Sequence, residues 1–125
     1  YTTLFRAQRV SCRPEGWKGT SWCADIHVSP DGRFVYGSNR GHHSVAVFAV
    51  DAERGTLSPV GHEPTRGEWP RGFALDPSGR VLIVANEHTD TLVPFLRDAE
   101  SGALRATGQL VRVPSPACVK ILPAT

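Results

Sequence analysis

The chain has 125 residues, of which 40% are hydrophobic and 21% charged, a balance typical of a soluble globular protein rather than a disordered one. Its 12 glycines and 10 prolines favour many turns over long helices, and no apolar run reaches the length of a membrane helix. The net charge of +2 comes with arginines spread singly along the chain, so no basic stripe predicts nucleic-acid binding.

The first half of the chain is predicted to fold as short strands. Residues 1–21 hold one candidate strand at 4–10 and a loop that contains Gly and Pro. Four strands follow, at 24–29, 34–39, 44–50 and from Thr56 onward. The first two flank the sequence SPDGR, in which Pro30 presets φ and Gly32 accepts a left-handed conformation, so a tight hairpin with a glycine bulge is expected. The sequence DAERG, which ends at Gly55, turns the chain into the fourth strand.

The second half repeats this pattern at an offset of 47 residues. A hairpin turn DPSGR, a strand at 91–97, a turn DAESG and a strand at 103–112 lie where the repeat requires them. The identities fall largely on turn residues, and they include Pro30/Pro77, Gly32/Gly79, Arg33/Arg80, Asn39/Asn86, Phe48/Phe95, Asp51/Asp98, Gly55/Gly102 and Gly61/Gly108. Residues 113–125 then supply a last candidate strand at 117–122 and a tail.

Four antiparallel strands that recur every 40 to 50 residues are typical of β-propeller blades. We therefore predict an all-β chain with two complete blades, residues 22–66 and 67–112, flanked by partial strands in residues 1–21 and 113–125. A single open sheet or a small sandwich is the alternative, but it leaves the recurrence of the turns unexplained. Blade faces are apolar on both sides, so further blades or another chain are needed to cover them. The start at Tyr1 and the lack of Met favour a fragment of a longer protein.

The cysteines and histidines predict no metal site. Cys12, Cys23 and Cys118 have no zinc-site spacing. A disulfide between Cys12 and Cys23 is possible, but we expect buried reduced thiols, which favour a cytoplasmic location. The sequence also lacks a phosphate-binding loop and a dinucleotide fingerprint, so no cofactor is expected.

Charged residues are predicted to gather where the hairpins open. Arg71 begins one hairpin and Glu87 ends it, and Asp25 and Arg40 stand in the same way in the preceding repeat. In a propeller these ends surround one mouth of the central channel, and His27 lies on the side of Asp25 but deeper. Asn39 and Asn86, at the ends of the second strands, join Asp25 and His27 as candidate substrate-binding residues.

Several stretches resemble the seven-bladed propeller lactonases, a family that includes the propeller type of 6-phosphogluconolactonase and carboxy-cis,cis-muconate cyclase. They are ADIHVSPDGR with VYGSNR, then WPRGFALDPSGR with VANE, and finally VPSPACVK. The resemblance covers residues 23–122 and implies the C-terminal third of a seven-bladed protein. It implies that Arg40, Arg71 and Glu87 are catalytic, with Arg40 the firmest assignment. It also implies that the principal catalytic His and a second Glu lie in other blades, so this stretch alone is expected to be inactive.

Lactone hydrolysis needs an activated water and a positive group for the developing oxyanion, which a carboxylate or His and an Arg can provide. The expected function is hydrolysis of a sugar lactone such as 6-phosphogluconolactone, by a carboxylic ester hydrolase. A cyclase-type isomerase that acts on a carboxylated muconate and a non-catalytic binding scaffold are the alternatives. The expected partner is a small lactone or carboxylated substrate, with no nucleic acid and no membrane.

Each candidate residue also has a structural interpretation. Arg40 could pair with a charge of a neighbouring blade, and Arg71 with Glu87 could be an ion pair that ties the strands of one blade. Asp25 and His27 could be satisfied by hydrogen bonds within the sheet. The tryptophans near the strand starts, Trp17, Trp22 and Trp69, are expected to pack between blades rather than to bind a sugar.

Overall fold

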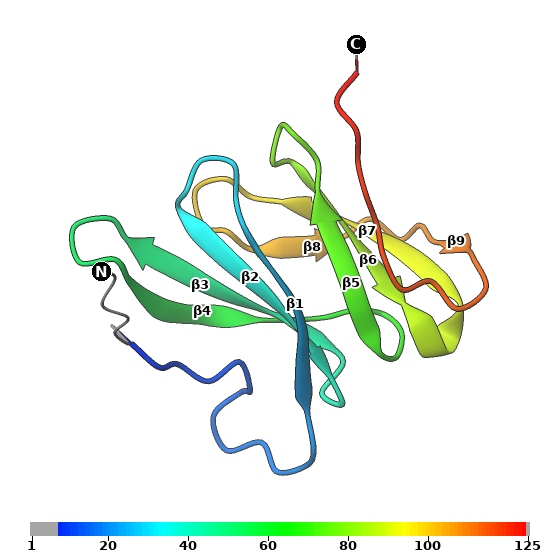
Figure 1. Cartoon of the computed structure of the whole chain (residues 1–125), viewed down its shortest axis with the longest axis horizontal. Helices are drawn as coiled ribbons and strands as arrows, with labels where there is room; N and C mark the ends of the chain where they lie inside the picture. The colour runs from blue at the N-terminus through cyan, green and yellow to red at the C-terminus, as the bar shows by residue number, and fades with distance from the viewer. Residues whose placement is uncertain (1–7, 125) are drawn as a thin grey trace, which may run out of the picture.

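Alternating apolar residues and Gly-containing turns fold the chain into two antiparallel sheets, as the computed structural model shows for residues 8–124. The first sheet contains β1 (Trp22–Val28), β2 (Phe34–Arg40), β3 (Ser44–Asp51) and β4 (Thr56–Pro64), which pair in chain order. The second contains β5 (Pro70–Leu75), β6 (Val81–Asn86), β7 (Thr91–Arg97), β8 (Leu104–Ala106) and β9 (Val111–Arg112), with a 3-10 turn, η1, at Glu87–Thr89. The sheets lie side by side as two blades (Figure 1). The prediction of an all-β chain with two antiparallel blades is thereby confirmed, with four strands in the first sheet and five in the second.

The ends of the second blade differ from the sequence prediction. The strand expected at 103–112 is broken into β8 and β9, which both pair with β7, because the chain turns through Gly108 at φ +83°. Residues 117–122 form no strand. They run alongside β5 instead, where the carbonyl of Ala117 lies against Gly72 (Figure 1). Most of the strand expected at 4–10 lies outside the described residues, and residues 8–10 are not in a strand.

The core lies between the two blades because strand residues alternate between the two faces of a sheet. Phe34 and Tyr36 on β2 belong to the same buried cluster as Phe73 and Phe95 of the second blade. The opposite face of the first blade has a smaller cluster around Phe48. One apolar core therefore holds the two blades together. Among the described residues, no helix has the length and apolarity needed to cross a membrane.

The predicted hairpin turns are confirmed. The Gly32 N–H donates to the carbonyl of Ser29 at 2.8 Å with φ +73°, and the Gly79 N–H donates to the carbonyl of Asp76 at 2.9 Å with φ +72°. Gly55 and Gly102 close the outer turns in the same left-handed conformation. At these positions a residue with a side chain is strained, because its Cβ approaches a backbone carbonyl oxygen.

Gly102 also lies against the first blade, and this contact distinguishes it from its repeat equivalent Gly55. A Cβ at Gly102 would overlap the ring of Phe34, whereas a Cβ at Gly55 would meet no atom within 4 Å. We expect Gly55→Ala to cost about 1 kcal/mol of unfolding free energy from backbone strain alone. Gly102→Ala should cost about 2 kcal/mol more, because the core around Phe34 is overpacked. Urea unfolding of the two variants checks this, and equal losses would contradict the close approach of the blades.

Candidate active site on the first strands of the blades

The first strands of the two blades, β1 and β5, lie against each other and bring the predicted charged residues to one region. Arg71 lies on β5 and Glu87 follows β6, and the Nη1 atom of Arg71 is 3.1 Å and 3.3 Å from the two carboxylate oxygens of Glu87. The Arg71 side chain is 53% exposed and that of Glu87 is 18% exposed, so the pair faces solvent through its arginine. The geometry thus joins two residues that are sixteen positions apart in the sequence.

Arg40 ends β2 of the first blade and reaches toward the second. Its Nη2 atom donates to the carbonyl of Cys23 at 3.0 Å, and its guanidinium carbon lies 5.6 Å from the ring centre of Trp69. Its Nε atom is buried and has no hydrogen-bond partner among residues 8–124. No ion pair to Arg40 occurs among these residues, so the interpretation as an interblade salt bridge finds no support there. The guanidinium makes one hydrogen bond among these residues, so its outer N–H groups have spare capacity to bind an anionic group.

Asp25 and His27 form a second pair on β1. The Nε2 atom of His27 is 3.1 Å from the Oδ2 atom of Asp25, and both side chains are about one-third exposed, at 34% each. The carboxylate also accepts hydrogen bonds from the N–H groups of Ile26 and of Phe73 in the second blade. A carboxylate only accepts, so the proton of this pair lies on Nε2, and Nδ1 of a neutral His27 is left as an acceptor. The pair is satisfied within the sheet and links the two blades.

Asn39 and Asn86 are placed differently from the substrate-binding role that we assigned to them. Both are fully buried. The Nδ2 atom of Asn39 donates to the carbonyl of Cys12 at 2.8 Å, and that of Asn86 donates to the carbonyl of Thr65 at 2.8 Å. Each amide therefore holds the connection that leads into its own blade, and neither presents a group to a ligand in this structure.

Trp22 and Trp69 pack against each other between the blades, as we expected, whereas Trp17 packs on His42 of the first blade. The rings of Trp22 and Trp69 are 5.6 Å apart, and the ring of His88 stacks on Trp69 at 4.5 Å and 8°. The special position of Trp69 escaped the sequence analysis. Its φ of +66° is left-handed although Pro70 follows, and a residue before proline normally adopts an extended conformation. No local signal in the sequence predicts this conformation.

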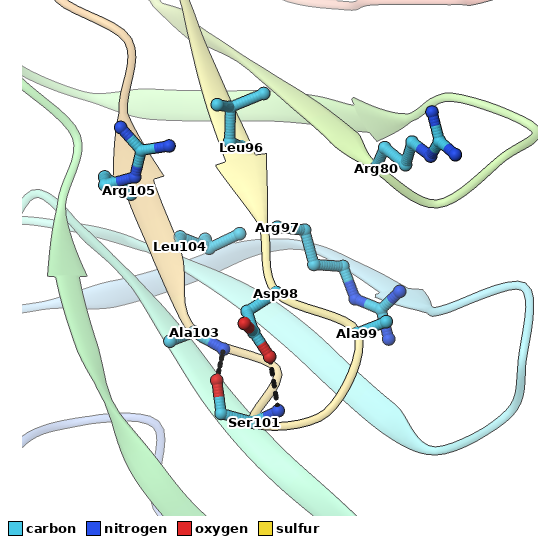
Figure 2. A pocket seen from close by; sticks show the side chains of 9 residues that line it. All are labelled: Arg80, Leu96, Arg97, Asp98, Ala99, Ser101, Ala103, Leu104 and Arg105. Carbon is cyan, nitrogen blue, oxygen red and sulfur yellow. Dashed lines mark hydrogen bonds between the residues drawn. The ribbon is translucent and has the colours of Figure 1, made fainter.

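The described residues also contain an open hollow at the outer strands of the second blade, away from the candidate site. Figure 2 shows its lining, which comes largely from β7, the DAESG turn and β8. Asp98 and Ser101 hold that turn through the hydrogen bond from the Ser101 N–H to the Asp98 carboxylate. Arg97 extends away from the hollow (Figure 2) and bonds Asp31 of the first blade. None of the predicted site residues lines this hollow.

The three cysteines are free thiols, but they are not all buried as expected. Cys12 is half-buried, while Cys23 and Cys118 are exposed. Burial, assisted by the neighbouring Cys23 thiol, raises the pKa of Cys12 to about 12. The Cys12 thiol is therefore protonated near neutral pH and is a poor nucleophile.

Comparison with known proteins agrees with the resemblance seen in the sequence. A 6-phosphogluconolactonase of Bacillus subtilis is 47% identical over 115 residues, which is 92% of this chain and 33% of the relative. One of Formosa agariphila is 51% identical over 88 residues, or 69% of this chain and 25% of the relative. The chain therefore spans a third or less of the length of these curated relatives.

Solved structures give the same result. The periplasmic gluconolactonase PpgL of Pseudomonas aeruginosa superimposes with a TM-score of 0.80 at 40% identity, over 84% of this chain and 29% of that one. A protein from Lactobacillus plantarum gives 0.86 at 39% identity, over 91% of this chain and 33% of that one. The family model for the lactonases with a seven-bladed β-propeller matches residues 1–121. This chain belongs to that family.

Proposed function

We propose that the protein that carries this chain is a lactonase that hydrolyses a six-carbon sugar lactone, with 6-phosphogluconolactone as its substrate. The chain supplies two neighbouring blades, and the remaining blades complete the channel and the catalytic set. The observation that carries the proposal is the gathering of Arg40, the Arg71–Glu87 pair and the Asp25–His27 pair on or beside the first strands of both blades. Relatives over the same residues are named for this activity.

The roles follow from charge and geometry. Attack of water on the lactone carbonyl develops an oxyanion, and in this proposal the outer N–H groups of the Arg40 guanidinium stabilise it. Glu87, oriented by Arg71, accepts the proton of the attacking water. When the oxyanion collapses and the C–O bond of the lactone ring breaks, Glu87 returns this proton to the leaving ring oxygen. The open side of the Arg71 guanidinium binds the phosphate of the substrate, because arginine pairs well with phosphate oxygens. Nδ1 of His27 accepts a hydrogen bond from a sugar hydroxyl.

The three free thiols favour a cytoplasmic location, because exposed cysteines in oxidising compartments tend to pair. The periplasmic relative shows that the family is also found outside the cytoplasm. We therefore propose that the enzyme is cytoplasmic.

The test is a hydrolysis assay on the protein at its natural length, with 6-phosphogluconolactone and gluconolactone as substrates. We expect turnover of the phosphorylated lactone to exceed that of gluconolactone. Arg71→Ala should lower kcat/KM for the phosphorylated lactone about tenfold, the scale of one charge-assisted hydrogen bond, and should affect gluconolactone less. Equal effects on both substrates would mean that Arg71 only orients Glu87 and does not bind the phosphate. Binding without turnover would favour a scaffold, and formation of a lactone from a carboxylated muconate would favour a cyclase.

A further inference from the structure

The connection between the two blades, residues 65–69, is held at both ends by one residue of the first blade, His43. His43 lies in the turn between β2 and β3, and its carbonyl accepts hydrogen bonds from the N–H of Thr65 at 3.0 Å and from its hydroxyl at 3.1 Å. Its Nδ1 atom accepts a hydrogen bond from the N–H of Trp69 at 3.0 Å. His43 thus fixes both ends of the connection.

Trp69 is held in a conformation that it would not adopt by itself. A left-handed φ costs a residue with a side chain about 1–2 kcal/mol, and at Trp69 Pro70 adds a further restriction. Strain of this kind persists only where surrounding contacts determine the backbone, and it is concentrated at functional sites. Here the contacts are the His43 bond on one side and the stacked ring of His88 on the other.

The conformation of Trp69 positions Glu87 of the second blade and Arg40 of the first. Its carbonyl accepts the N–H of Glu87 at 3.0 Å, which fixes the residue where β6 ends. Its ring lies beneath the guanidinium of Arg40, 5.6 Å from the guanidinium carbon. Arg40 and Glu87 make no hydrogen bond or ion pair with each other in the described residues, but both contact Trp69.

We propose that His43 and Trp69 are positioning residues that set Arg40 of one blade relative to Glu87 of the other. This inference rests on the proposed function of Arg40 and Glu87. Neither His43 nor Trp69 touches the substrate: His43 acts through Trp69, and Trp69 acts through its carbonyl and its ring. The role of His43 requires Nδ1 to be an acceptor, so the bonds assign the neutral tautomer with its proton on Nε2.

The test separates the effect of losing the Nδ1 acceptor of His43 from the effect of changing the backbone conformation at that position. His43 has φ +56°, which Gly adopts without strain and Asn tolerates better than most residues, so both His43→Gly and His43→Asn are compatible with the turn. The Oδ1 atom of Asn lies one bond beyond Cγ, as Nδ1 of His does, and can accept the Trp69 N–H. Gly has no acceptor. The neighbouring His42 contacts Ser44 and Trp17 instead, so His42→Ala is the matched control.

The first readout is amide hydrogen exchange, which needs no activity. His43→Gly should speed exchange at the Trp69 and Glu87 amides about fivefold, the factor for loss of one hydrogen bond. His43→Asn and His42→Ala should leave both amides close to wild type. Unchanged exchange in His43→Gly would overturn the inference.

The second readout is lactone hydrolysis by the protein at its natural length. His43→Gly should lower kcat about tenfold with little change in KM, since the reacting groups are misplaced while substrate contacts remain, and His43→Asn should restore most of the loss. Faster exchange together with an unchanged kcat would also overturn the inference. If the wild type hydrolyses no lactone, the proposed function fails, and exchange at Glu87 alone decides whether His43 positions it.

Discussion

Replacing Arg40 by alanine is expected to lower kcat/KM for lactone hydrolysis by about 100-fold or more. That is the scale for removing one donor that stabilises a developing oxyanion. The guanidinium of Arg40 makes one hydrogen bond in the described residues, to the carbonyl of Cys23, so its outer N–H groups are left to bind the developing oxyanion. Interactions that form in the transition state alone lower the barrier, and their loss lowers kcat rather than raising KM.

The control for Arg40→Ala is Arg54→Ala, which removes an exposed arginine from the outer turn of the same blade. Arg54→Ala should leave both kcat and KM unchanged. Thermal unfolding of both variants verifies that the fold is retained. An Arg40→Ala enzyme with wild-type turnover would remove Arg40 from the mechanism and leave its contacts with Cys23 and Trp69 as a purely structural role.

Replacing Arg97 by alanine is expected to cost about 3 kcal/mol of unfolding free energy, the lower end of the range for breaking a buried ion pair. The Arg97 side chain is 2% exposed. It bonds both carboxylate oxygens of Asp31 at 3.0 Å and 3.2 Å, the hydroxyl of Tyr36 at 2.8 Å and the carbonyl of Gly79 at 3.0 Å. The lower end applies because Asp31 is one-third exposed and stays solvated.

Urea unfolding measures this loss, and Arg80→Ala is the control because Arg80 is exposed on the neighbouring hairpin. The control should stay within about 0.5 kcal/mol of the wild type. A loss below about 1 kcal/mol in Arg97→Ala would mean that solvent replaces the bonds to Asp31 and Tyr36, as it does at exposed ion pairs.

The Asp31 carboxylate also makes this effect dependent on pH. A hydrogen bond from the Ser29 hydroxyl, together with the Arg33 N–H and Arg97, holds the pKa of Asp31 well below its usual range. A lowered pKa in the folded state stabilises the protein above the unfolded pKa of about 4, and this stabilisation is lost as the pH falls through the folded value. The unfolded pKa is the same for the wild type and the variant, so the cost of Arg97→Ala should shrink only well below about pH 4, as the folded Asp31 carboxylate becomes protonated.

The parts of the fold that depend on short sequences could be predicted. The hairpin turns form because Pro and Gly fix the backbone locally, and the repeat of 47 residues then places the second blade. The break between β8 and β9 has no such signal. Although the alignment pairs Gly108 with Gly61, only Gly108 has a left-handed φ.

The candidate site was predicted in part for the same reason. The Arg71–Glu87 pair follows from the pairing of the two strands of one hairpin, and the Asp25–His27 pair from the alternation of side chains along β1, so both placements could be predicted. The bond between Arg97 and Asp31 joins two blades at positions where the repeat has Val50 and Ser78, so no periodicity reveals it.

The buried asparagines show that each blade begins before its first strand. Asn39 and Asn86 hold the carbonyls of Cys12 and Thr65, which precede the first strand of their respective blades. The unit that recurs is therefore a sheet together with its incoming segment. A blade transplanted into another propeller from the start of β1 or β5 would leave a buried amide without its acceptor. A graft that begins before Cys12 or Thr65 keeps that bond.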